Sequence, residues 1–218
     1  STQGYSSAAS DVYKRQRFPL EGRQVDLQFS YSQPFSNVVK EKIEPRQSSQ
    51  SILQLGYQFT CQYGDKDYFA LIVFNAMFGE FAHSVLFTEI REKEGLAYSI
   101  SSQLNVFTGL LEVYAGIEKD NRNQAIRGIS RELNNIKLGR FSSSLLNQTK
   151  KIIRMNALLS EDNALTLVEQ CFNKVIFEDK SLSSEQWLDN MEKVTKKDVC
   201  RVARQVKLQS LFFLEGVS

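Results

Sequence analysis

The pattern of apolar and polar positions changes its period within residues 86–100, LFTEIREKEGLAYSI. The first part has the three-to-four-residue spacing of a helix: Leu86, Phe87 and Ile90 form an apolar stripe, and charged residues fill the opposite side. Gly95 stands where a helix needs a left-handed residue in order to end. We therefore predict a helix that stops at this glycine.

The second part of the same segment has the two-residue period of a strand. Leu96, Tyr98 and Ile100 alternate with small residues, which predicts that these three side chains share one face of a sheet. We expect the Tyr98 ring to be at least half buried, with its hydroxyl reaching solvent. A helix joined to a strand through one glycine is a rigid corner, and such a corner suits side chains that must be held in place.

The same two periods predict the other elements. Asp65 is expected to cap the first helix, and Thr195 with Asp198 to form a capping box at the last one. Strands in the first part and helices in the second indicate an α+β domain, with one mostly antiparallel sheet and helices packed on one face. The predicted helices cover about 66–78, 120–139, 142–159, 161–177 and 195–206; the predicted strands cover 51–60 and 208–214 and a pair joined at Thr108 and Gly109.

The strand after Gly109 predicts two unlike faces of the sheet. Its inward face carries only apolar residues, whereas Glu112 and Tyr114 lie on the other face. We expect these two side chains to stand beside Tyr98 and to give a polar sheet surface that faces a wet cavity. The inward residues are Leu111, Val113, Ala115 and Ile117.

The chain divides into three parts by composition. Residues 1–16, STQGYSSAASDVYKRQ, lack periodicity and resemble translated adaptor sequence, so we treat them as a non-native leader and expect a preceding half upstream in the gene. Residues 17–50 are polar and contain prolines, and we expect a linker there with a short alternating stretch at 24–31. The domain itself is expected to cover residues 51–218.

Overall composition fits one domain. The 218 residues are 42% hydrophobic and 24% charged, enough to bury a sizeable core. A net charge of +2 with both signs interspersed argues against nucleic acid or an anionic membrane as partner, and no apolar run is long enough to span a bilayer. Cys61, Cys171 and Cys200 show no pairing pattern, so we expect reduced, buried thiols in a cytoplasmic protein.

Arg91 and Tyr98 are the side chains of the corner with the most distinctive chemistry. Arg91 lies about 40° past Phe87 on a helical wheel, at the edge of the apolar stripe. In a functional interpretation, a guanidinium and a phenol converge on one bound peptide backbone or carboxylate. In a structural interpretation, Arg91 forms a surface ion pair with Glu94 or Glu118, and Tyr98 is a core tyrosine.

Residues 78–100, FGEFAHSVLFTEIREKEGLAYSI, resemble a segment in the second half of the insulinase/pitrilysin family, the inverted zincins. They keep its Leu-Phe, Arg-Glu-Lys and Gly-Leu-Ala-Tyr parts, and the likeness runs from about residue 51 to 216. The family's arginine and tyrosine bind substrate beside the zinc of the other half, and they map onto Arg91 and Tyr98. The resemblance thus implies a C-terminal, non-zinc half-domain of a metallopeptidase, with zinc in the partner half.

The family's glycine-rich turn is reduced here to Gly79, and Glu80 and Phe81 stand where glycines are usual. We expect Gly79 and His83 to lie in a loop at the rim of a chamber. His83 is the single histidine, so the His-x-x-Glu-His zinc motif is absent and no metal is expected in this chain. A zinc site that combines His83 with a cysteine and a carboxylate, or a Cys–His nucleophile pair, stays open as an alternative, although no ligand spacing supports either.

Two functions follow from the resemblance. In the first, this chain is the non-zinc half of a peptidase; it binds peptide substrate and closes a chamber against a zinc-bearing half-domain or a homologous subunit. In the second, it belongs to a pseudo-peptidase that serves as a binding or scaffold subunit, as family relatives do in processing peptidases and in a respiratory complex. In either case the chain is expected to be inactive by itself.

Overall fold

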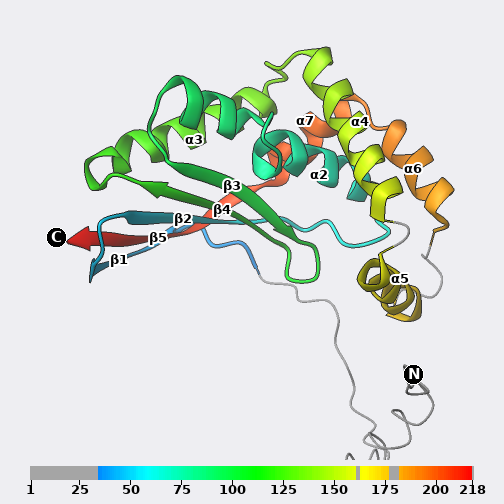
Figure 1. The fold of residues 1–218 in the computed structure, drawn as a ribbon, viewed down its shortest axis with the longest axis horizontal. Coiled ribbons are helices and arrows are strands. Elements are labelled where there is room, and N and C mark those ends of the chain that lie inside the picture. The colour runs from blue at the N-terminus through cyan, green and yellow to red at the C-terminus, as the bar shows by residue number, and fades with distance from the viewer. Residues whose placement is uncertain (1–33, 161–162, 177–181, 218) are drawn as a thin grey trace, which may run out of the picture.

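The computed structural model describes residues 34–160, 163–176 and 182–217. Within these ranges, five strands form one sheet in the order β1-β5-β2-β4-β3 (Figure 1). Neighbouring strands are antiparallel except for β1, which is parallel to β5. The prediction of a mostly antiparallel sheet is therefore confirmed. The strands are β1 (Lys40–Gln47), β2 (Ser51–Gln58), β3 (Ser99–Asn105), β4 (Leu110–Ile117) and β5 (Lys207–Val217).

Strand β1 lies in the segment that was expected to be a linker, so that expectation is wrong for Lys40–Gln47. Nearly all of its residues are exposed, because it is an edge strand that pairs only with β5. Such a strand needs backbone hydrogen bonds but little apolar surface, and charge and proline are common at sheet edges. Because the composition of β1 is polar, the apolar pattern did not predict this strand. The stretch at 24–31 lies outside the described residues.

The helices gather on one face of the sheet, as predicted, and α5 lies apart from them at one end (Figure 1). One short helix, α6, was not predicted; Ser183 and Gln186 form a capping box at its start. The helical elements are α2 (Tyr68–Asn75), η1 (Ala76–Glu80), η2 (Leu86–Lys93), η3 (Lys119–Asn121), α3 (Arg122–Lys137), α4 (Ser143–Ser160), α5 (Ala164–Ile176), α6 (Ser184–Glu192) and α7 (Lys196–Gln205).

The two predicted helix caps have different outcomes. The capping box of Thr195 and Asp198 is present at α7, which confirms that prediction. The prediction for Asp65 is wrong: its carboxylate accepts from the backbone N–H of Gln62, and α2 begins after Asp67. Asp67 instead accepts two bonds from the guanidinium of Arg201, at 3.0 and 2.6 Å, which hold its pKa below the usual range and tie α2 to α7.

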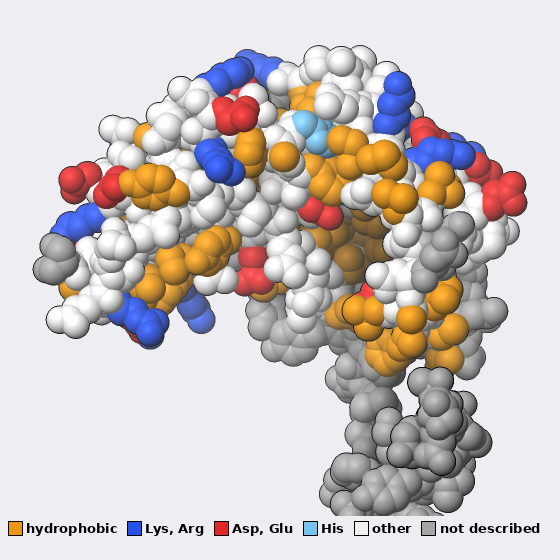
Figure 2. Space-filling view, in the orientation of Figure 1, with side chains coloured by type: hydrophobic (Ala, Val, Ile, Leu, Met, Phe, Trp, Pro, Cys, Tyr) orange, Lys and Arg blue, Asp and Glu red, His pale blue; other side chains and the backbone are white. Residues whose placement is uncertain are grey.

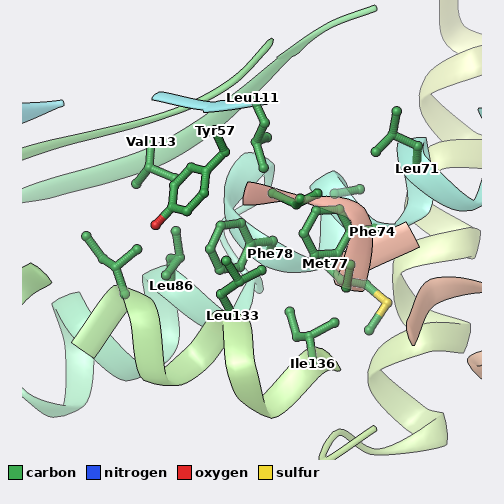
Figure 3. Close-up of a cluster of buried hydrophobic side chains, with 14 of the residues drawn as sticks. Tyr57, Leu71, Phe74, Met77, Phe78, Leu86, Leu111, Val113, Leu133 and Ile136 are labelled. Carbon is green, nitrogen blue, oxygen red and sulfur yellow. The ribbon is translucent and has the colours of Figure 1, made fainter. Parts of the chain in front are cut away.

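The core lies between the sheet and the helices that cover it. Phe74 and Phe78 stack with ring centroids 5.5 Å apart, between Tyr57 of β2 and Leu133 of α3 (Figure 3). The four predicted inward residues of β4 are all fully buried, which confirms the face assigned to that strand. Burying these apolar side chains is the main source of the fold's stability.

Helical segment η1 lies directly against β3. Its backbone forms widened, π-helical turns, and Gly79 is buried there rather than lying in a loop, so the expected loop position of Gly79 is wrong. A Cβ atom on Gly79 would lie 2.7 to 2.9 Å from Oγ, Cβ and the backbone nitrogen of Ser102. Ser102 in turn donates a buried hydrogen bond to Oδ1 of Asn75, at 2.7 Å. Only glycine permits so close an approach of helix to strand.

We predict that Gly79→Ala lowers the free energy of unfolding by about 1–3 kcal/mol, because the new methyl group meets strand backbone that has no room to move. Gly128→Ala in α3 is the matched control. Its Cβ meets the flexible end of Ile90, and alanine also gains up to about 1 kcal/mol of helix propensity. Urea unfolding measures both, and equal stabilities for the two variants would contradict the close approach at Gly79.

Candidate functional site

The site begins at the end of η2, where the chain turns from helix into strand. The backbone N–H of Leu96 donates to the carbonyl of Ile90, six residues earlier, at 3.0 Å, and this bond closes the end of the helix. Gly95 has φ of +62°, which confirms it as the residue that ends the helix. A Cβ atom there would meet nothing within 4 Å, so glycine is favoured by backbone conformation and not by space.

Tyr98 lies just before β3, which begins at Ser99. Its backbone N–H donates to the carbonyl of Gly116 at 2.8 Å, so pairing with β4 extends to this residue. The side chain is 55% exposed, and the prediction of a half-buried ring is wrong. The reason is its place at the end of the sheet, where Ala97 takes the buried position instead.

The hydroxyl of Tyr98 donates a hydrogen bond to the carboxylate of Glu118, which follows β4. This bond is the main reason that the pKa of the Tyr98 phenol is raised, because removing the phenolic proton would leave two facing anions. A phenol has one proton to donate. That proton is therefore directed to Glu118, and the remaining lone pair on the oxygen is left to accept.

Arg91 is exposed on η2, with the carbon of its guanidinium 4.6 Å from the centre of the Phe87 ring. Within the described residues it has no hydrogen bond or ion pair. Its expected partners are engaged elsewhere: Glu94 is paired with Arg131 of α3, and Glu118 accepts from Tyr98. The structural interpretation of Arg91 as one half of a surface ion pair is therefore wrong, and so is that of Tyr98 as a core residue.

The uncovered face of the sheet is polar where β3 pairs with β4, but the neighbours there differ from those expected. In the pairing of β3 with β4, Ser101 lies opposite Tyr114, and Gln103 lies opposite Glu112. Tyr98 therefore does not stand beside Glu112 and Tyr114, because it lies three residues before Ser101 and bonds to Gly116 near the end of β4. Sequence alternation could not supply this register, which depends on where the hairpin turns.

His83 lies between η1 and η2, in the loop expected for it. Its Nε2 atom is 2.9 Å from the hydroxyl of Thr149 on α4, and its ring stacks on Phe81 with centroids 5.6 Å apart. Partial burial lowers the pKa of His83, which favours the neutral ring. These contacts give the histidine a structural place between the loop and α4, and neither contact is with a cysteine or a carboxylate.

The described part of the chain contains no group of three His, Cys, Asp or Glu residues that could hold a metal ion. Cys61 and Cys200 are buried, and burial raises the pKa of the Cys61 thiol to about 12. Cys171 is exposed on α5, so the expectation of a buried thiol is wrong there. In the same ranges, no helix is both long enough and apolar enough to cross a bilayer.

A small hollow of about 390 Å³ lies against the corner, between it and α3. Its lining includes Glu94, Leu96 and Arg131, but neither Arg91 nor Tyr98. The two candidate residues are instead exposed side chains on either side of Gly95. This corner is the site that the geometry offers: five guanidinium donors on Arg91 that no described residue engages, and one acceptor lone pair on Tyr98.

Comparison with known proteins identifies relatives of this chain. "Probable inactive metalloprotease YmfF" of Bacillus subtilis is 38% identical over 177 residues, which are 81% of this chain and 41% of that protein. "Uncharacterized zinc protease YmxG" of the same organism is 24% identical over 163 residues, 74% of this chain and 40% of that protein. The chain thus spans less than half the length of these relatives.

Solved structures with the same fold include proteins of this kind. A conserved protein from Enterococcus faecalis V583 superposes with a TM-score of 0.86 and 38% identity, over 98% of this chain and 50% of that one. A peptidase M16 inactive domain from Pseudomonas fluorescens shares the fold, with a TM-score of 0.71 and 18% identity over 87% of this chain and 46% of that one. The family model described as "Peptidase M16 inactive domain" matches residues 10–153. The chain therefore belongs to the peptidase M16 inactive-domain family.

Proposed function

We propose that this chain is the non-zinc half of an M16 peptidase, which holds peptide substrate at Arg91 and Tyr98 and closes a chamber against a zinc-bearing half. The observation that carries the proposal is the exposed guanidinium of Arg91, which no described residue pairs, on the same corner as the exposed phenol of Tyr98. Family membership and a length of about half that of its relatives support it. The partner is then a preceding half-domain or a homologous subunit.

Arg91 and Tyr98 bind different groups of a peptide backbone in this proposal. The guanidinium of Arg91 donates to a substrate carbonyl oxygen, and this charge-assisted bond strengthens as negative charge develops on that oxygen. The phenol oxygen of Tyr98 accepts a hydrogen bond from a peptide N–H, while its own O–H keeps its proton and donates to Glu118. Neither group transfers a proton, so the reaction itself belongs to the other half.

The described residues of this chain do not fit a zinc site. Its single histidine contacts Thr149 and Phe81, and the described residues hold no ligand cluster. Relatives are named zinc proteases, and we propose that the ion lies in the zinc-bearing half. Three free cysteines support our further proposal that the protein works in the cytoplasm.

A second function has its own support. A relative at 38% identity is named a probable inactive metalloprotease, and the glycine-rich turn of the family is replaced here by Glu80 and Phe81. Both observations favour a pseudo-peptidase that binds or scaffolds without cleaving. A His-x-x-Glu-His motif in the half that precedes this chain would separate the peptidase from the scaffold.

We predict that Arg91→Ala in the full-length protein lowers peptide turnover by roughly tenfold to a thousandfold, the range for losing a donor that stabilises developing charge. Tyr98→Phe should lower peptide turnover by less, because the phenol oxygen only accepts a hydrogen bond from the substrate. Quenched fluorescent peptides report both rates. Arg140→Ala is the control, since Arg140 is another exposed arginine with no side-chain bond within the described residues, and its turnover should be that of the parent protein.

The fold should be unaffected by Arg91→Ala, since the side chain loses only its contact with Phe87, worth about 0.5–1 kcal/mol. Thermal unfolding measures this, and Arg201→Ala, which removes two hydrogen bonds to Asp67, should lower stability by more. Unchanged turnover in a folded Arg91→Ala protein would reduce Arg91 to an ordinary surface residue and would remove the proposed binding role.

We predict that this chain by itself, purified and dialysed against a zinc buffer, holds no stoichiometric zinc and cleaves no peptide in a zinc-dependent manner. The reason is the missing ligand set: a catalytic zinc needs three protein ligands, and one histidine without a neighbouring cysteine or carboxylate does not provide them. Metal analysis by mass spectrometry checks the first part. One zinc per chain would contradict the assignment of the ion to the other half.

A further inference from the structure

The largest hollow described in the structure lies away from Arg91 and Tyr98. It has a volume of about 840 Å³ and lies among α2, the turn after η1, and helices α4, α5 and α6. Figure 2 shows it as a deep hollow in the right half of the view, with hydrophobic side chains around its mouth and below it, where Figure 1 shows α5. Its wall combines four aromatic rings with one carboxylate: Tyr63, Tyr68, Phe81, Trp187 and Glu80.

The aromatic wall is held by edge-to-face packing. The rings of Tyr63 and Tyr68 have centroids 4.9 Å apart, and Tyr68 packs against Phe69 at 5.3 Å. Phe69 packs in the same manner against Trp187, at 5.6 Å. Rings fixed in this way present a stable surface of ring faces and edges to a ligand. Such surfaces favour the flat or cationic part of a bound molecule.

Among the described residues that line the hollow, Glu80 is the only acidic one. One carboxylate oxygen accepts a hydrogen bond from Nδ2 of Asn75, at 2.9 Å, and within the described residues no Lys, Arg or His pairs with it. Partial burial raises the pKa of this carboxyl, because the anion has lost water around it. A carboxylate that no described cation neutralises, set among aromatic rings, favours a cationic ligand.

Glu80 and Phe81 are neighbours in the chain at the end of η1, and they supply the charge and one ring of this wall. The volume is that of a site for a whole ligand, larger than one amino-acid side chain. Asn156 and Asn173 in the lining carry amides that can bond a peptide backbone.

We propose that this hollow is a peptide-binding site selective for an arginine or lysine side chain, which pairs with Glu80 while its aliphatic stem lies against the rings. The site is separate from Arg91 and Tyr98, and the proposal concerns binding only. It holds equally for an active peptidase and for a scaffold, so its failure and the failure of the proposed peptidase role are distinguishable.

Trp187 is the only tryptophan in the chain and lines the hollow, so its fluorescence reports occupancy directly. The probes are two acetylated, amidated pentapeptides of alanine with a central arginine or a central citrulline, the neutral analogue of arginine. We expect the arginine peptide to bind at least tenfold more tightly, the effect of losing a charge-assisted pair. Equal affinities of the two peptides, or no saturable change, would overturn the proposal.

Variants test whether the carboxylate of Glu80 gives the site its preference for arginine. Glu80→Gln keeps the hydrogen-bonding shape and should abolish the preference for arginine over citrulline, whereas Glu92→Gln, at an exposed carboxylate of η2, should leave it unchanged. Retained preference in Glu80→Gln would contradict the role of Glu80. N-acetylarginine methylamide tests for a small cation as ligand: affinity equal to that of the arginine peptide would refute the peptide as occupant.

A measurement without any variant covers the case in which Glu80→Gln fails to fold. Cys171 lines the hollow and is exposed, whereas Cys61 and Cys200 are buried. Modification of the parent protein by a maleimide should therefore occur at Cys171, and saturating arginine peptide should slow it by at least about threefold. Equal protection by the arginine and citrulline peptides, or none by either, would contradict a cation-selective site.

Discussion

The close approach of Gly79 to Ser102 is the constraint on which both candidate sites depend. At this point the helical segment that follows α2 lies against Ser102 of β3, whose Oγ, Cβ and backbone nitrogen would lie 2.7 to 2.9 Å from a Cβ atom at Gly79. Asn75 strengthens the contact, since its amide oxygen accepts from Ser102 and its amide nitrogen donates to Glu80. A single polar side chain thus connects the strand to the carboxylate that lines the large hollow.

From this contact the chain leads first to the hollow and then to the corner. η1 ends at Glu80, and Glu80 and the residue that follows it form part of the wall of the hollow. Further along, η2 runs back toward the sheet and ends before Gly95, which returns the chain to β3 with Arg91 and Tyr98 exposed. Glu80 of the proposed cation site and both residues of the proposed peptide-binding corner therefore lie within one stretch of about twenty residues. A shift of η1 on β3 would displace both.

Periodicity predicted the parts of the fold in which burial is continuous. The inward face of β4 and the helix that ends at Gly95 were found from spacing alone, since each has an unbroken apolar face and a clear terminator. Strand β1 was missed because an edge strand needs only backbone pairing. Asp65 was misassigned as a cap because several acidic and polar residues precede α2, and sequence cannot tell which one the backbone reaches.

The sequence named the residues of the candidate site but did not predict their surroundings. Resemblance to the family pointed to Arg91 and Tyr98, and spacing placed them around one glycine. Their environments depend on residues far along the chain: Arg131 engages Glu94, so that carboxylate does not pair with Arg91, and Glu118 accepts the hydrogen bond that Tyr98 donates. The hollow around Glu80 was not predicted, because its aromatic wall is assembled from four separate segments of the chain.

Photo-crosslinking tests the central claim most directly, since it asks whether peptide lies at the corner. In the full-length protein, Tyr98 is replaced by p-benzoylphenylalanine, and Leu138, at the far end of α3, is replaced in the same way as a control of equal exposure, 54% against 55%. The account predicts that bound peptide substrate crosslinks from position 98 and not from position 138. Crosslinking from neither position, or equally from both, would contradict the assignment of peptide binding to this corner.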